Sequence, residues 1–166
     1  VTIPISIIYT LGCKSIIITN AAGCLNIKWK IGDLMIISGY LDYTFRSGPH
    51  DPSIVMLNNN SNNKIINKAN KLGISVRKGI YSWVLGPSYE TRSEIQNIIT
   101  LGGDAVGMST VPEIIRATEL EMNIIGISCF TNYGAGLDNI VLSHEDVLKA
   151  SKKINKIFSN LLKEII

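Results

Sequence analysis

The stretch GPSYETRSEIQNIITLGGDAVGMST, residues 86–110, decides the fold, because it contains the signals for a loop, a helix, a short strand and the start of a second helix. Gly86-Pro87 interrupts the apolar segment before it, as such dipeptides do. Thr91 and Glu94 have the spacing of a capping box, which predicts a helix beginning just after Thr91. Gly102-Gly103 ends that helix, because glycine accepts the left-handed conformation that a helix C-terminus needs.

The second half of the stretch repeats the pattern. Asp104–Met108 is a short apolar run and predicts a buried strand. Thr110 and Glu113 have capping-box spacing again, and Pro112 falls in the first turn, so we expect a second helix to begin there. The apolar residues of the first helix, which we expect on its buried face, are Ile95, Ile98 and Ile99.

Chemically useful side chains follow each of these two strands. Tyr89 and Glu90 lie in the first loop, and Met108 and Ser109 lie in the second. Open α/β sheets bind ligands at the carboxyl edge of their strands, so we expect the four side chains to share one edge. Ser109 precedes a helix N-terminus, where free amides and the helix dipole favour an anion such as phosphate. The combination predicts a pocket for a flat polar heterocycle beside an anion.

The rest of the chain alternates between strand and helix patterns, which predicts the α/β class: one domain, residues 1–166, with a mixed β-sheet flanked by helices. The small residues of Asn20–Gly23 fit either a tight turn or the close approach of a ligand to the backbone. The expected elements are a helix tail at Val1–Leu11, strands at Lys14–Thr19, Leu34–Tyr40, Ile74–Leu85 and Asn123–Phe130, an irregular segment at Thr44–Asn63, a helix at Lys64–Leu72, a loop at Tyr133–Leu142 and a long terminal helix from Ser143.

Composition limits the possible function classes. The 166 residues are 46% hydrophobic and 17% charged with a net charge of +3, as in a globular protein. No basic block interleaved with aromatic residues suggests nucleic-acid binding, and no apolar run is long enough to span a membrane. The three cysteines, Cys13, Cys24 and Cys129, have neither metal-ligand nor disulfide spacing, which favours a reducing, cytoplasmic location and no metal site.

Five motifs together resemble a known family, the trimeric purine nucleoside phosphorylases, over nearly the whole chain. They are, in order, Thr19–Gly23, Gly32–Met35, Gly86–Thr91, Leu101–Glu113 and Gly126–Ser128 with Thr131-Asn132. The resemblance implies the nucleoside phosphorylase fold and a homotrimer. It also implies cleavage of purine (deoxy)ribonucleosides, inosine and guanosine above all, by inorganic phosphate in purine salvage. Phosphate is then a co-substrate, and no cofactor is expected.

The resemblance also implies roles for single residues, with Glu90 and Asn132 as the catalytic pair. Glu90 would accept hydrogen bonds from the purine, and Asn132 would face its O6 and N7 side and stabilise negative charge as the base departs. Tyr89 and Gly23 would line the base, Met108 would pack under the ribose and His144 would approach the 5′-hydroxyl. Ser109 and the backbone N–H of Ala21 would bind phosphate.

The chain also departs from the family pattern. The serine, histidine and arginine that relatives contribute to the phosphate site from an N-terminal portion have no counterpart after Val1, so we expect a chain that continues something longer and binds phosphate weakly. Cys24 replaces a usual glycine, and we expect it to crowd the pocket wall. Phe45–Asn63 differs from the family in sequence, which leaves the contribution of a neighbouring subunit open.

Two alternatives remain at this point. Methylthioadenosine phosphorylases of the same superfamily usually carry Asp where this chain has Asn132, so Asn132 favours 6-oxopurines over adenine nucleosides. The other alternative is a non-catalytic purine-binding remnant that lacks the phosphate site.

Overall fold

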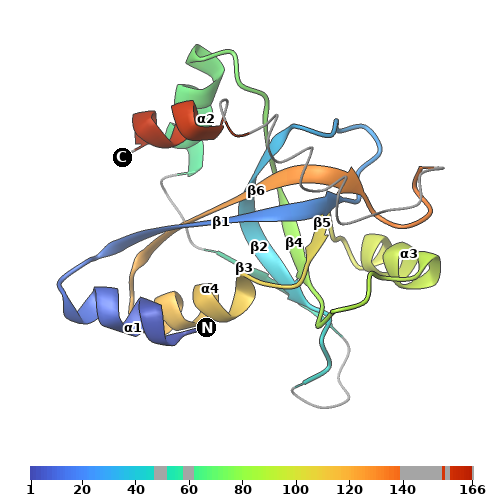
Figure 1. Cartoon of the computed structure of the whole chain (residues 1–166), viewed down its shortest axis with the longest axis horizontal. Coiled ribbons are helices and arrows are strands. Elements are labelled where there is room, and N and C mark those ends of the chain that lie inside the picture. Colours follow the sequence, from blue (N-terminus) through green and yellow to red (C-terminus); the bar gives the residue numbers. More distant parts are fainter. Residues whose placement is uncertain (47–51, 58–61, 139–154, 156–157, 166) are drawn as a thin grey trace.

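The computed structural model describes residues 1–46, 52–57, 62–138, 155 and 158–165. One helix and three successive strands come first, and from residue 62 to residue 133 helices and strands alternate (Figure 1). Residues 158–165 are also helical. The elements are α1 (Ile3–Thr10), β1 (Ser15–Cys24), β2 (Leu34–Asp42), β3 (Ile54–Met56), α2 (Asn62–Lys71), β4 (Val76–Trp83), α3 (Arg92–Thr100), β5 (Ala105–Gly107), α4 (Val111–Glu119) and β6 (Asn123–Tyr133).

The strands form one mixed sheet that closes on itself. Their order is β3-β2-β4-β5-β1-β6, and β6 also pairs with β2, so that five strands make a ring and β3 extends from β2. β2, β4 and β5 run parallel to one another, whereas β1 and β6 run in the opposite direction. The mixed sheet with flanking helices agrees with the predicted class. The expectation of one open carboxyl edge is wrong, because the β2–β6 pairing closes the sheet.

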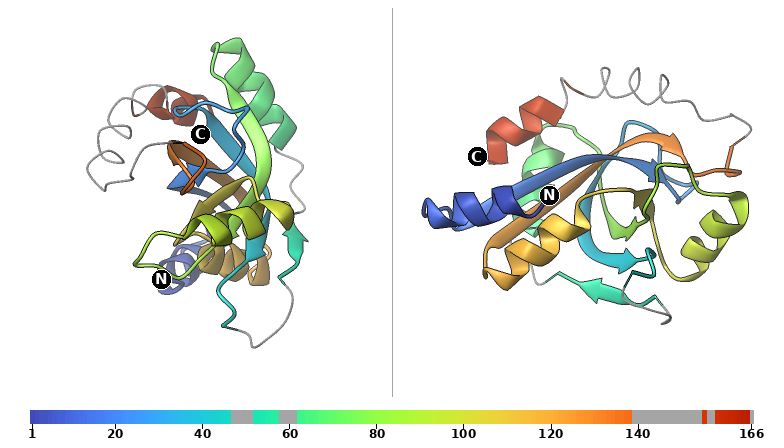
Figure 2. Two further views of the ribbon diagram at one scale, coloured as in Figure 1. Left: turned by 90° about the vertical axis from the view of Figure 1, so that its right-hand side faces the viewer. Right: turned by 60° about the horizontal axis from the view of Figure 1, so that its bottom comes forward.

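The core lies on both sides of β2. Side chains alternate along a strand, so Met35 and Ile37 pack in one cluster with Tyr81 and Phe130, and the neighbouring positions of β2 pack in another. This second cluster holds α2 and the 158–165 helix against the sheet. A strand buried on both faces reads as a continuous apolar run, which explains the sequence Leu34–Ile37. On another side of the sheet, α1 lies beside α4 (Figure 2).

The predicted ends of α3 are confirmed. Thr91 Oγ1 accepts from the Glu94 N–H at 3.3 Å, and the Glu94 carboxylate accepts from the Thr91 N–H at 2.7 Å. At the other end Gly102 has φ +93°, and the Gly103 N–H donates to the Ile98 carbonyl at 2.9 Å. These bonds satisfy amides and carbonyls that a helix end leaves free, and they fix where the chain turns into β5.

The second predicted capping box is wrong. Thr110 has φ +79° and ψ −48° and makes no side-chain cap bond to α4. Its hydroxyl instead accepts a hydrogen bond from the Asn20 side-chain amide at 2.8 Å. Capping requires an extended residue whose side chain points along the helix, and the turn at Thr110 does not provide it.

Four other expectations need correction or lie outside the described residues. Asn20–Gly23 is not a turn, because β1 continues through Cys24. β6 likewise continues past Phe130 to Tyr133, and the segment expected to be irregular contains β3. Of the long terminal helix, only residue 155 and residues 158–165 are described, and Leu161 there is fully buried. Ser143 lies outside the described residues.

Candidate active site

A pocket of about 230 Å³ brings together seven of the residues expected in the site. Its walls come from the second half of β1, from β5 and the residues after it, from the end of β6 and from the loop after β4. The predicted residues are Ala21, Gly23, Tyr89, Glu90, Met108, Ser109 and Asn132, and the others are Ala22, Val106, Gly107 and Thr131. His144 lies outside the described residues.

Glu90 brings a carboxylate to this pocket in a half-buried position. Burial raises the pKa of its carboxyl above the ordinary value, and the nearby Glu94 carboxylate raises it further, while a backbone hydrogen bond acts in the opposite direction. A carboxylate in a partly desolvated position gains more from a hydrogen-bond donor than one in water does. Glu90 can therefore hold an N–H group of a ligand.

A bulge in β6 sets the position of Asn132. β1 and β6 pair residue by residue up to Ala22 and Phe130, and then Gly23 pairs with Asn132, so Thr131 is the extra residue. Bulges re-aim side chains, here at the wall of a pocket. The Asn132 amide is then held at both ends: Thr131 Oγ1 donates to its oxygen at 2.8 Å, and its nitrogen donates to the Tyr133 carbonyl at 2.9 Å.

Gly23 makes room for this amide. A Cβ atom at Gly23 would lie 3.2 Å from Asn132 Nδ2 and 3.0 Å from Val106 Cγ1, both tighter than ordinary contacts. Cys24, next in the strand, points the other way, since strand side chains alternate. It is fully buried among core residues, and burial raises the pKa of its thiol to about 11. The expectation that Cys24 crowds the pocket is therefore wrong.

Ser109 and Ala21 are exposed at the pocket and offer groups that can bind an anion, and we call this part of the pocket the anion subsite. Ser109 lies just before α4, whose first amides have no helical partners. Among the described residues, its N–H makes one long contact, 3.5 Å from the Tyr81 hydroxyl, so it remains available to a stronger acceptor. Its hydroxyl lies 3.1 Å from Thr110 Oγ1.

Met108 fills the space between the pocket and the turn after β4. Gly86 in that turn has φ +69°, and a Cβ there would lie 2.3 Å from Met108 Sδ. Glycine at this position thus lets the thioether pack under the pocket, where its apolar surface suits the carbon face of a sugar or a ring.

Sequence reasoning missed Tyr81, which supports the site from behind. It is fully buried, and its hydroxyl is close to Ser109 and Thr110. Burial raises the pKa of this phenol, so that it stays protonated. A Cβ at Gly107 would lie 2.3 Å from its oxygen, which explains why glycine precedes Met108. No local signal marks Tyr81, because it belongs to the apolar run of β4 and meets Ser109 only through the pairing of β4 with β5.

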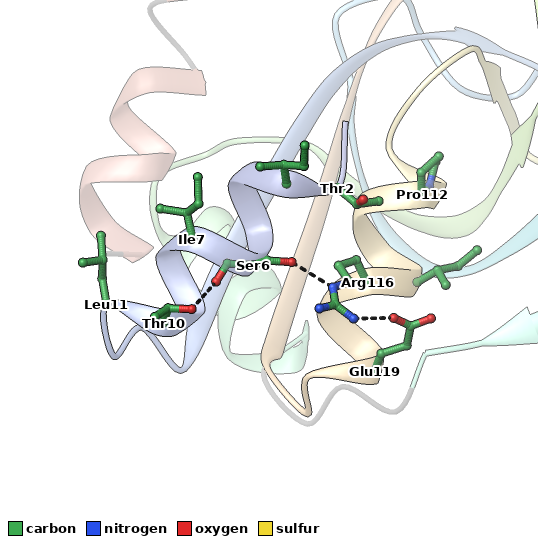
Figure 3. Close-up of a pocket in the computed structure, with 10 residues that line it drawn as sticks. Thr2, Ser6, Ile7, Thr10, Leu11, Pro112, Arg116 and Glu119 are labelled. Carbon is green, nitrogen blue, oxygen red and sulfur yellow. Dashed lines mark hydrogen bonds and ion pairs between the residues drawn. The ribbon is translucent and has the colours of Figure 1, made fainter.

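A larger hollow, of about 620 Å³, lies away from this site between α1 and α4 (Figure 3). Arg116 crosses it and is already paired, donating to Ser6 Oγ at 2.9 Å and to the Glu119 carboxylate at 2.8 Å. Within the described residues, no group of three or more His, Cys, Asp or Glu side chains could hold a metal ion. The helices that the structure describes include none with the length and apolar character of a membrane span.

Comparison with known proteins gives concordant results. A model of the family described as "Phosphorylase superfamily" matches residues 1–166. Purine nucleoside phosphorylase 1 of Bacillus subtilis is 38% identical, and the match covers 100% of this chain and 65% of the relative. The probable 6-oxopurine nucleoside phosphorylase of Thermococcus kodakarensis is 35% identical, over 95% of this chain and 66% of its own.

Solved structures agree with these relatives. The purine nucleoside phosphorylase of Schistosoma mansoni in complex with inosine superposes with a TM-score of 0.86 at 27% identity, covering 99% of this chain and 65% of that chain. A Schistosoma purine nucleoside phosphorylase in complex with guanosine also superposes with a TM-score of 0.86, at 26% identity over 99% of this chain and 66% of that chain. The chain thus spans about 65% of the length of the Bacillus subtilis and Schistosoma mansoni proteins.

Proposed function

Because the chain belongs to the phosphorylase superfamily, we propose that it carries the purine and ribose subsites of a purine nucleoside phosphorylase. The reaction is cleavage of a purine nucleoside, inosine or guanosine, by inorganic phosphate, which releases the free base and ribose 1-phosphate. The observation that carries this proposal is the pocket in which Glu90, Asn132 and Ser109 meet from three separate segments.

The chemistry of the pocket fits this reaction. As the glycosidic bond breaks, negative charge develops on the departing purine and positive charge on the sugar. Asn132, fixed by Thr131 and Tyr133, can present its amide to the departing base, and a preorganised donor of this kind is worth roughly 3 kcal/mol in the transition state. Glu90 accepts from an N–H of the base, while Ser109 and the Ala21 amide hold phosphate on the opposite side of the sugar.

The preference for one purine base over another follows from the side chains of Glu90 and Asn132. A site that hydrogen-bonds particular ring atoms rejects analogues that leave its polar groups unpaired. An amide at Asn132 offers an N–H to the carbonyl of a 6-oxopurine, whereas an aspartate would suit the exocyclic amine of adenine. Two relatives bear the name 6-oxopurine nucleoside phosphorylase, those of Thermococcus kodakarensis and Pyrococcus furiosus, and this supports inosine and guanosine as substrates.

The homotrimer implied by the resemblance is also part of the proposal. A hollow of about 440 Å³ adjoins the pocket, with Glu90 and Tyr89 in both linings. Exposed apolar side chains gather there, with Phe45 48%, Leu85 55% and Tyr89 44% exposed. Apolar surface beside a polar site is typical of an interface. Sedimentation equilibrium tests it: a mass of three chains supports the trimer, and a monomer at assay concentration contradicts it.

The activity is tested by the release of hypoxanthine from inosine, with and without phosphate. Phosphate-dependent release supports the proposal. Binding of hypoxanthine without any turnover would instead favour a non-catalytic purine-binding protein, and turnover of methylthioadenosine in preference to inosine would favour the methylthioadenosine phosphorylases.

A further inference from the structure

The backbone turns sharply at Thr110, directly after the anion subsite. Thr110 has φ +79° and ψ −48°, and the Val111 N–H donates to the Ser109 carbonyl at 2.9 Å. This is a three-residue γ-turn of the strained form, which is rare for a residue with a branched side chain. Such a conformation costs on the order of 1–3 kcal/mol and persists only where its surroundings impose it.

Asn20 on β1 supplies that constraint. Its side-chain nitrogen donates to Thr110 Oγ1 at 2.8 Å, although the two residues lie far apart in the sequence. Thr110 is only 2% exposed, so little water competes for this bond. The bond ties the turn to the same strand that supplies Ala21 to the pocket.

The hydrogen bonds run in one direction, toward the pocket. An amide nitrogen can only donate, so Thr110 Oγ1 accepts from Asn20 and keeps its own proton. Thr110 Oγ1 lies 3.1 Å from Ser109 Oγ, and either hydroxyl can be the donor. An anion at Ser109 favours the arrangement in which Thr110 donates to Ser109 and Ser109 donates to the anion. Each donor in such a chain polarises the next and strengthens it.

The side-chain oxygen of Asn20 indicates that this residue does not serve to stabilise the fold. Its oxygen is buried and has no hydrogen-bond partner among the described residues. A buried acceptor without a partner is unfavourable, and an apolar side chain of the same size would avoid the loss. A group of this kind in a native structure calls for an explanation, and the donor role of the nitrogen provides one.

We propose that Asn20 and Thr110 are positioning residues for phosphate, which act through Ser109 by holding the γ-turn and directing the Ser109 hydroxyl at the anion. The inference rests on the proposed function. It adds to that function a second layer of residues, neither of which lines the pocket.

Thr110→Val and Asn20→Leu test the proposal, because each removes the donor and keeps the approximate shape of the side chain. We expect either change to raise the KM for phosphate roughly three- to tenfold and to leave the KM for inosine nearly unchanged. Thr110→Ser, which keeps the hydroxyl, restores the wild-type KM. Thr118→Val is the matched control: it removes a hydroxyl on α4 that donates to the Ile114 carbonyl at 2.8 Å, away from the pocket.

The rise in melting temperature caused by phosphate gives a second readout that needs no turnover. A merely structural role would lower the melting temperature of both variants and leave the phosphate-induced rise intact. An unchanged phosphate KM and an unchanged rise in Thr110→Val and Asn20→Leu would overturn the inference while the proposed function stands. If Thr110→Val does not fold, Asn20→Leu decides alone.

The two proposals fail in different ways. A wild-type protein that turns over no nucleoside, but whose phosphate-induced rise disappears in the variants, contradicts the function and supports the inference. A wild-type protein on which phosphate has no effect contradicts both.

Discussion

Replacing Gly23 by alanine tests whether the position of Asn132 controls binding of the base. The added Cβ would lie 3.0 Å from Val106 Cγ1 and 3.2 Å from Asn132 Nδ2, so both side chains must move by a few tenths of an ångström. Overpacking of this kind typically costs about 1–3 kcal/mol of stability. The amide of Asn132 would leave the geometry set by Thr131 and Tyr133, and loss of one good hydrogen bond to hypoxanthine corresponds to roughly three- to tenfold weaker binding.

Gly126→Ala is a matched control on β6. Its Cβ would lie 3.0 Å from Ile37 Cβ, in the core and away from the pocket, so the strain is similar and Asn132 is untouched. We expect urea denaturation to give similar losses of stability for the two variants, and calorimetric titration with hypoxanthine to give weaker binding for Gly23→Ala alone. Equal affinities of the two variants for hypoxanthine, measured on folded protein, would refute the reasoning.

Three further predictions concern Glu90, Asn132 and the start of α3. The raised pKa of Glu90 means that the fold disfavours its ionised form, so wild-type stability falls as pH rises through the raised pKa. Glu90→Gln should therefore be more stable than wild type at pH 7 in urea denaturation, and it should bind hypoxanthine more weakly. A variant less stable than wild type would contradict this prediction. Asn132→Asp should raise the rate with adenosine relative to inosine in a spectrophotometric assay, and an unchanged ratio would remove the argument for base selection. Thr91→Ala should cost about 1 kcal/mol at neutral pH, because it removes the hydroxyl that caps α3 and also donates to the Glu94 carboxylate. Hydrogen bonds from Thr91 lower the pKa of Glu94, so the cost should shrink as pH falls through that lowered pKa, while the part due to the Glu94 N–H bond remains. No loss of stability at neutral pH would contradict the capping role.

Interactions between residues close together in the sequence were sufficient to predict much of the fold. The capping box at Thr91 and the left-handed Gly102 depend on residues a few positions apart, and the structure confirms both. The family resemblance is confirmed by the match over residues 1–166, and the nucleoside phosphorylase fold by the superposition on the Schistosoma mansoni protein. The pocket gathers seven of the eight residues that this resemblance selected, all but His144, which lies outside the described residues, and the roles of the seven remain predictions.

The wrong predictions all depend on pairings between distant residues. Thr110 has a capping-box sequence, yet the bond from Asn20 draws its side chain away from α4. Cys24 was expected at the pocket because it follows Gly23, and the alternation of β1 directs it to the core. The closure of the sheet depends on β2 meeting β6, for which no local pattern exists. Such contacts compete with local preferences and override them.

The site depends above all on the register of β1. Gly23 pairs with Val106 on one side and with Asn132 on the other, so one backbone position aligns two walls of the pocket. A slip of one residue would turn every side chain of the strand to the opposite face. It would put a cysteine where Asn132 needs empty space, and it would remove Asn20 from Thr110. Because β1 is paired on both sides, with β5 and with β6, such a slip would break both sets of pairings at once. The closed ring thereby holds the Asn132 amide, Gly23 and the γ-turn in one relative position.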